Sequence, residues 1–187
     1  MDAAITATIE ELEANRAMLT ALIRCCPAEQ IDRPVPESAW RVRDYLAHLA
    51  VADQIATAYL RAARAGEDGA AATQGRNLDQ WNGAEVRQRA GRSVPVLLAE
   101  MESRREQSVA LLAAFDDADL DHAIYFPGDA RRSPGPIPLR LWLQAWSKHD
   151  MLHARDLLRA LPSLAAHADF QAWLADEPFL DAINRRS

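Results

Sequence analysis

Apolar residues recur every three or four positions in four long stretches of this chain, the spacing that buries one face of an α-helix. The first stretch predicts a helix over residues 3–26, which Pro27 stops. The second predicts a helix over residues 42–65. The apolar positions behind these two predictions are Ile5, Ile9, Leu12, Met18, Leu19, Leu22 and Ile23, then Val42, Tyr45, Leu46, Leu49, Ile55 and Leu60.

The middle of the chain predicts a loop, a shorter helix and a third long helix. Residues 66–75 are small, polar and glycine-bearing, so we expect a loop there, and residues 78–90 predict a short helix. Ser93 can cap the third long helix, because Pro95 is tolerated in a first turn. The helix continues through Val96, Leu97, Met101, Val109 and Leu112 until the acidic residues 116–119.

Residues 121–138 contain four prolines and two glycines, so only residues 123–126 are expected to be extended. Pro138 then opens a fourth helix that runs to Leu161 and ends before Pro162. We therefore expect an all-α protein in which residues 1–165 form a four-helix bundle and residues 166–187 form a short helical C-terminal tail.

Composition narrows the class of protein. Hydrophobic residues make up 49% of the chain and charged residues 26%, a balance that permits both a sizeable core and a solvated surface. The net charge of −6 argues against nucleic acid as the main partner, because a phosphate backbone selects clustered Lys and Arg. Arg104 and Arg105 are accordingly interpreted as part of a solvated helix face. No apolar run reaches the length of a membrane span.

Cys25 and Cys26 are adjacent, a spacing too strained for an ordinary structural disulfide. We interpret them as reduced residues at the end of a helix, which predicts a cytoplasmic protein.

The residues with the clearest chemistry are His149 and His153. They are four positions apart in a predicted helix, so both imidazoles lie on one face and can reach one ion. The pair alone is weak evidence, since two ordinary histidines on a polar helix face would have the same spacing.

His48 adds to this evidence, because Leu46, Leu49 and neighbouring alanines predict that its helix is buried around most of its circumference. A buried imidazole needs a hydrogen-bond partner or a ligand, since leaving it unsatisfied is costly. Asp44, one turn earlier, can orient His48 or pair with it at the surface. His122 and His167 are expected to be solvated, and Trp142 and Trp146 to pack in the core. Trp40 is expected either to wall the cavity or to act as a hydrophobic staple.

Two segments resemble a known family. Residues 40–50, WRVRDYLAHLA, resemble the start of the second helix in the DinB-like superfamily, which includes DNA-damage-inducible proteins and the mycothiol-dependent maleylpyruvate isomerases. Residues 146–153, WSKHDMLH, are similar to the His-Asp-x-x-His segment on the family's last bundle helix. The order of the segments also agrees, and the resemblance extends over roughly residues 5–161.

The resemblance implies an up-down-down-up bundle with a long crossover connection. It also implies that His48, His149 and His153 bind one divalent metal ion, zinc or nickel first, with iron and manganese as further options. A low-molecular-weight-thiol S-transferase that acts on a small electrophile follows as the leading function, with a metal-hydroxide hydrolase as a variant. The family further suggests a homodimer.

One position departs from the family pattern. The isomerases carry a carboxylate where this chain has His149, and three neutral histidines compensate less of the metal's charge, so the isomerase activity itself is not carried over. A second hypothesis from another class is a non-catalytic, stress-associated protein that binds a small molecule or a metal, because fold alone does not establish catalysis.

Overall fold

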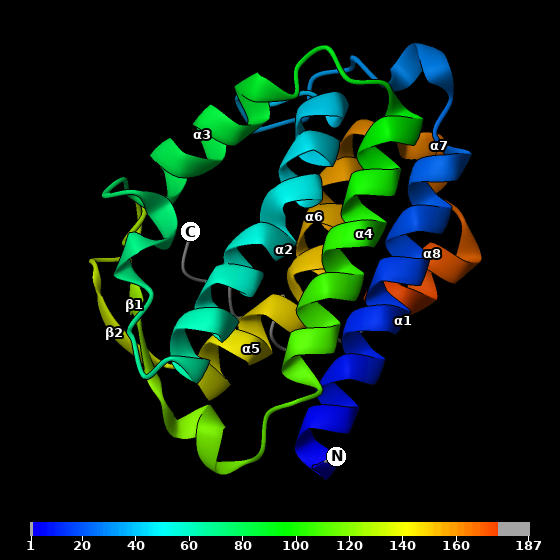
Figure 1. Ribbon diagram of the computed structural model, residues 1–187. Helices are drawn as coiled ribbons and strands as arrows, with labels where there is room; N and C mark the ends of the chain where they lie inside the picture. Colours follow the sequence, from blue (N-terminus) through cyan, green and yellow to red (C-terminus); the bar gives the residue numbers. More distant parts are fainter. Residues whose placement is uncertain (1, 176–187) are drawn as a thin grey trace.

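Four long helices lie side by side in the computed structural model, which describes residues 2–175 (Figure 1). They are α1 (Ala3–Cys25), α2 (Val42–Arg64), α4 (Val94–Leu112) and a fourth made of α5 (Leu139–Ser147) followed by α6 (His149–Ala160). Both α2 and α4 run opposite to α1, whereas α5 and α6 run with it (Figure 1). The predicted all-α, up-down-down-up bundle is therefore confirmed.

A long crossover joins α2 to α4, since two neighbours that run the same way need a connection as long as the bundle. It contains the 3₁₀ turn η2 (Ala70–Thr73) and α3 (Leu78–Gln88), which slants along the outside of α2 (Figure 1). Asn77 begins α3 as a capping residue, because its side chain accepts the backbone N–H of Gln80 at 2.9 Å. The predicted short helix at this place is confirmed.

A β-hairpin lies along the flank of the bundle, beside α2 and α5 (Figure 1). β1 (Ala123–Phe126) pairs antiparallel with β2 (Gly135–Pro138), with Ala123 opposite Pro138 and Phe126 opposite Gly135. Only β1 was predicted, because the prolines of β2 argue against a strand. A two-stranded sheet leaves β2 with a free edge, where residues without an N–H group are tolerated.

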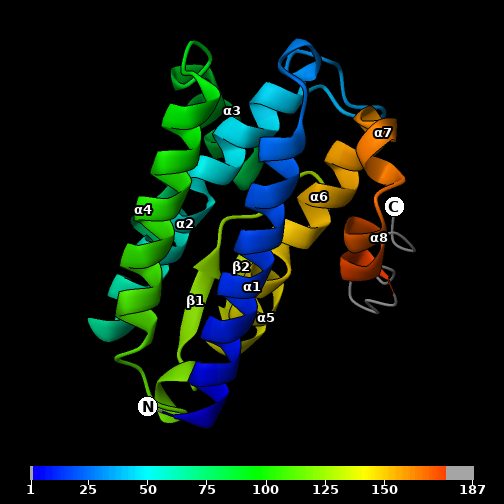
Figure 2. The same cartoon turned by 90° about the vertical axis from the view of Figure 1, so that its right-hand side faces the viewer.

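The fourth helix was predicted to be continuous, but it is broken at Lys148, between α5 and α6 (Figure 2). The side-chain N–H of Asn15 on α1 donates to the backbone carbonyl of Ser147 at 2.8 Å, and this contact is buried. A side chain that takes a helical carbonyl as its acceptor interrupts the ladder of backbone hydrogen bonds and bends the helix.

Two short helices follow the bundle. They are α7 (Pro162–Ala165), for which Pro162 supplies the first residue, and α8 (Ala168–Leu174), which agrees with the helix expected in the tail. Phe170 and Leu174 of α8 are buried against the bundle, and the indole N–H of Trp173 donates to Asn15 Oδ1 at 2.8 Å. The division into a bundle at 1–165 and a tail at 166–187 stays a prediction, and residues after 175 lie outside the described part of the chain.

The apolar core consists of two clusters, one above the other along the bundle. One cluster includes Leu22, Leu46 and Leu157, and the other includes Leu12, Leu60, Leu112 and Leu143. α2 serves both, and every residue from Tyr45 to Asp53 on it is buried, as its alanine-rich sequence predicted. Among residues 2–175, no helix has the length and hydropathy needed to span a membrane.

A layer of buried charge lies where the two clusters meet. On α1, Arg16 follows Leu12 of one cluster and precedes Leu19 of the other. Three further buried charges occupy corresponding levels on their helices: Asp53 on α2, Arg105 on α4 and Asp150 on α6.

Two glycines of the crossover provide a matched test of packing. Gly66 and Gly69 both have a φ near +74°, at +73° and +74°, but only Gly69 would bring a Cβ atom to 2.7 Å from the buried Tyr59 ring. We expect Gly66→Ala to cost about 1 kcal/mol of unfolding free energy through backbone strain alone. Gly69→Ala should cost about 1–3 kcal/mol more, because the ring must shift. Chemical unfolding of both variants measures the difference, and equal losses would contradict the close packing of this loop on α2.

Candidate metal centre

Three histidine side chains from two helices meet at one point. His48 lies on α2, and His149 and His153 lie one turn apart at the start of α6. Their Nε2 atoms are 3.2 Å apart for His48 and His149, 3.1 Å for His48 and His153, and 3.1 Å for His149 and His153. The structure therefore brings together the three residues that the sequence singled out, from positions about a hundred residues apart.

Hydrogen bonding within the trio does not account for this triangle. A neutral imidazole Nε2 is either a donor or an acceptor, so among three such atoms at least two are alike and cannot bond to each other. A tetrahedral zinc ion with Zn–N bonds of about 2.0–2.1 Å would place its nitrogen ligands about 3.3 Å apart. The observed separations are close to that value, so the donor set fits a divalent cation with at least one coordination position left open.

Burial keeps the imidazoles of His48 and His149 in the form that binds metal. Desolvation, with a further contribution from the nearby imidazole of His153, lowers the pKa of His48 well below 6.5. The same causes, desolvation first, lower the pKa of His149 in the same direction. A neutral histidine has a free lone pair on Nε2, whereas a protonated one cannot coordinate an ion.

The second nitrogen of each ring decides how firmly the ring is held. Nδ1 of His153 is 3.1 Å from Oδ2 of Asp156, and Arg159 binds the other oxygen of that carboxylate. A carboxylate behind a metal-binding histidine fixes the ring and raises its basicity. Within residues 2–175, the Nδ1 atoms of His48 and His149 are buried without a hydrogen-bond partner.

Asp44 caps α2 rather than orienting His48 or pairing with it. Its carboxylate accepts the backbone N–H of Arg41 at 2.9 Å and so caps the start of α2. Asp156, one turn after His153, supplies the orienting carboxylate instead.

Aromatic rings form one side of the centre. The Trp40 ring lies 5.1 Å from the His48 ring, and the Tyr45 ring lies 5.4 Å from the His153 ring, edge to face. Trp40 precedes α2 and its backbone carbonyl accepts the N–H of Val35 at 3.0 Å, which closes the loop before α2. The Trp40 ring also packs edge to face on Tyr45 at 5.4 Å, which joins the residue before the cap of α2 to the fourth residue of the helix, so the expected hydrophobic staple is confirmed and the same ring contacts His48.

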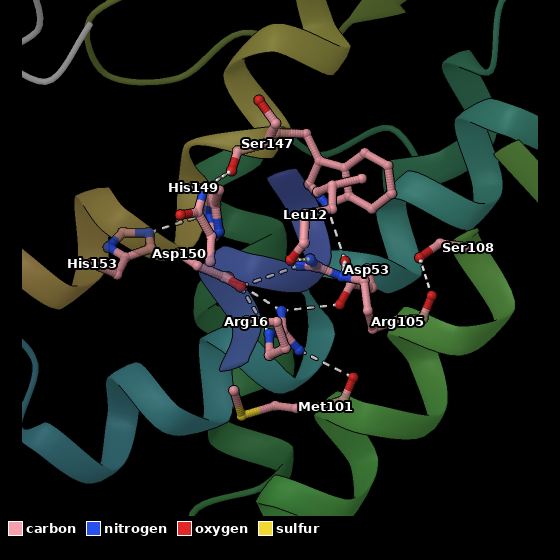
Figure 3. A network of polar contacts seen from close by, with 12 residues as sticks. Leu12, Arg16, Asp53, Met101, Arg105, Ser108, Ser147, His149, Asp150 and His153 are labelled. Carbon is pink, nitrogen blue, oxygen red and sulfur yellow. Dashed lines mark hydrogen bonds and ion pairs between the residues drawn. The ribbon is translucent and has the colours of Figure 1, made fainter. Parts of the chain in front are cut away.

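The buried charges adjoin the histidines of α6, because Asp150 directly follows His149 (Figure 3). Arg16 binds Asp53 at 3.1 Å and Asp150 at 2.8 Å. Arg105 binds the same two carboxylates, at 3.0 Å and 3.3 Å. The indole N–H of Trp146 donates to Asp53 Oδ1 at 3.0 Å. We call Arg16, Asp53, Arg105 and Asp150 the charged layer; its two positive and two negative charges cancel.

Sequence reasoning missed the charged layer and was wrong about one of its members. Arg105 was interpreted as solvated, but it is only 5% exposed. A signal was present, because Arg16 follows Leu12 by four residues and Arg105 follows Met101 by four, which places both on apolar helix faces. Charged residues in an apolar stripe are buried only when they are paired.

The remaining histidines lie elsewhere. His122 is partly buried rather than solvated, with Nε2 2.7 Å from the carbonyl oxygen of Glu67 in the crossover. His167 is exposed, as expected.

Comparisons with known proteins agree with this architecture. The family model described as the DinB superfamily matches residues 11–157. The crystal structure of the mycothiol-dependent maleylpyruvate isomerase shares the fold with a TM-score of 0.66 at 12% identity. A histidine-to-alanine mutant of that isomerase gives 0.63 at 11%. Each alignment covers 82% of this chain and 60% of the other, so the chain spans about three fifths of those structures' length. No curated protein matches the sequence.

The lowered pKa values predict how the stability of the metal-free protein varies with pH. Below pH of about 6.5 the unfolded chain protonates His48 and His149 while the folded chain does not, so the unfolded state binds more protons and stability falls as the pH falls. We expect the unfolding free energy of chelator-treated protein to decline by up to about 1.4 kcal/mol per pH unit for each histidine. Urea unfolding at a series of pH values measures this slope. If a variant with both His48→Gln and His149→Gln shows the same slope, the pH dependence does not come from these two histidines.

Proposed function

The chain belongs to the DinB superfamily, and on that premise we propose that it is a divalent-metal-dependent enzyme whose ion is bound by His48, His149 and His153. The observation that carries this proposal is the triangle of Nε2 atoms with edges of 3.1–3.2 Å. Imidazole nitrogen suits several divalent metals, of which we propose zinc or nickel.

The electrostatics of the centre favour an anionic reactant. Three neutral imidazoles leave the charge of a divalent ion uncompensated, and the charged layer beside them is neutral as a whole. Asp156 is bonded to His153, but Arg159 binds the same carboxylate and offsets its charge. An ion in this setting would lower the pKa of a bound water or thiol, so that the deprotonated nucleophile is present at neutral pH.

We propose that the nucleophile is a low-molecular-weight thiol and that the reaction is its S-transfer to a small electrophile. The thiol would lose its proton to solvent, and its sulfur would form a bond to the electrophilic carbon. At the same time the bond from that carbon to a leaving group, or the π bond of an activated double bond, would break, and the anion so formed would take a proton from solvent. The solved enzyme that shares this fold is mycothiol-dependent, which supports a thiol as co-substrate. The nucleophile then comes from the co-substrate, so the protein need supply only binding and orientation.

Residues around the centre have roles that follow from their positions. Asp156 holds the His153 ring by its Nδ1 atom, and the charged layer holds the backbone next to His149. Trp40 and Tyr45 present ring faces and edges beside the histidines, which limits the access of water and offers an apolar surface to the carbon skeleton of a substrate. Tyr45 is anchored there by its hydroxyl, 3.2 Å from the hydroxyl of Ser38.

Metal analysis tests the first part of the proposal. We expect about one divalent ion per chain in protein purified without chelator, and a higher melting temperature with the ion than without it. His153→Ala should lose the ion and the thermal shift, because two remaining imidazoles hold a divalent ion far more weakly. His167→Ala is the matched control, since that histidine is exposed and on the far side of α7. Unchanged metal content in His153→Ala would refute the site.

Cobalt substitution tests the thiol. The visible spectrum of the cobalt form should change when a thiolate joins the three nitrogen ligands, so we would titrate mycothiol, bacillithiol and glutathione separately. The matched control for each is its hydroxyl analogue, in which oxygen replaces sulfur. A spectral change with one thiol and none with its analogue is the expected result. No response to any thiol would reject the transferase and favour the non-catalytic binding protein.

A further inference from the structure

Both helices that carry the histidines also contribute a carboxylate to the charged layer. On α2, Asp53 lies five residues after His48, and on α6, Asp150 directly follows His149. Both carboxylates are inaccessible to solvent, at 0% and 1% exposed. α2 and α6, the two helices that carry the histidines, therefore meet at two polar sites, one at the histidines and one at the charged layer.

The arginines are shared between the two carboxylates rather than paired one to one. Arg16 donates from Nε and Nη2 to Asp150, at 2.8 and 3.1 Å, and from Nη2 to Asp53 at 3.1 Å. Arg105 donates from Nε to Asp53 and from Nη2 to Asp150, at 3.0 and 3.3 Å. Each guanidinium therefore bridges α2 to α6 (Figure 3).

The same side chains fix the two other long helices. Nη1 of Arg16 on α1 donates to the carbonyl of Met101 on α4 at 3.1 Å, and Nη1 of Arg105 on α4 donates to the carbonyl of Leu12 on α1 at 2.6 Å. A shift of any one long helix along its axis breaks bonds to the others, because a guanidinium has a planar fork with fixed donor directions.

Stability alone is a weak reason for such a layer. A buried ion-pair network can often be replaced by apolar residues of similar volume without loss of stability. What apolar packing supplies poorly is register: α2 and α6 otherwise meet through aliphatic side chains such as Leu46, Ala50 and Leu157, and hydrophobic contact has no preferred direction. A slip of one residue moves a helix by about 1.5 Å along its axis. A metal site tolerates displacements of its ligand atoms of only about 0.5 Å.

We propose that Arg16 and Arg105 are positioning residues of the metal centre: by bridging Asp53 to Asp150 they set the register of α2 against α6, and so bring His48 to coordination distance from His149 and His153. This inference rests on the proposed function, because it presupposes that the three histidines bind an ion.

The test compares two buried arginines with similar surroundings. Arg105→Met removes one bridge of the charged layer. Arg89→Met is the matched control, because Arg89 is also buried, at 4% exposed, and binds the two carboxylates of Glu85 and Glu100. Its contacts join α3 to α4 and include neither helix that carries a histidine. The measurements are cobalt affinity, the visible spectrum of the cobalt form, and urea unfolding with chelator present.

We expect Arg105→Met to weaken cobalt binding at least about tenfold and to reduce the intense visible bands of a tetrahedral cobalt site. Arg89→Met should lower the unfolding midpoint comparably while its affinity and spectrum stay as in the wild type. If both variants lose affinity in proportion to their stability, the layer is merely structural and the inference is wrong.

A second variant covers the case in which Arg105→Met does not fold. Arg105→Met combined with Asp53→Asn keeps the layer neutral, with Arg16 paired to Asp150 and an amide oxygen left for Trp146. We expect this double variant to fold and still to bind cobalt at least about tenfold more weakly. Wild-type affinity and spectrum in the double variant would overturn the inference alone, whereas a wild-type protein that binds no ion would overturn the proposed function with it.

Discussion

The pairing of two arginines with two aspartates at mid-height of the bundle is the constraint on which the other features depend. Four charges removed from water are tolerated only when each has partners, and here each guanidinium reaches both carboxylates. The apolar core is divided accordingly, with one cluster on each side of the charged layer. Since one member comes from each of the four long helices, their relative heights are set by directional bonds rather than by packing alone.

The three histidines lie beside the charged layer but are not members of it. Their three nitrogen donors are neutral, and the layer beside them adds no net charge, so the charge of a bound ion is left for an incoming anion to compensate. On the proposed function, that electrostatic setting is the physical reason for preferring a thiolate or a hydroxide as the fourth ligand.

The break in the fourth helix shows how a local irregularity is maintained from a distance. Asn15 on α1 contacts the Ser147 carbonyl on one side and the Trp173 indole on the other, so α1 and α8 together support the point at which α5 gives way to α6. The residues directly after that point are Lys148, His149 and Asp150. α8 thus contacts the bundle at the level of the histidines rather than at its end.

The sequence by itself determined the helices and the histidines. The three-to-four periodicity predicted α1 and α2 to within one residue and also the start of α4, because the apolar face of a helix is encoded within the segment itself. α4 ends at Leu112, before the acidic residues that were expected to stop it. His149 and His153 could be paired from their spacing, and His48 from its place on a buried helix and its resemblance to the family. Only the tertiary structure decided that Arg16 and Arg105 are buried, that Asp156 rather than Asp44 contacts one of the three histidines, that Asn15 interrupts the fourth helix, and that a proline-rich segment forms β2. Asp156 lies three residues from His153 on the same helix, and β2 pairs with the neighbouring β1, so local spacing permits both without selecting them. The buried arginines and Asn15 depend on partners in other elements, from 37 residues away for Arg16 and Asp53 to 134 for Arg16 and Asp150. No local pattern contains such partners, since they meet only after the helices have packed.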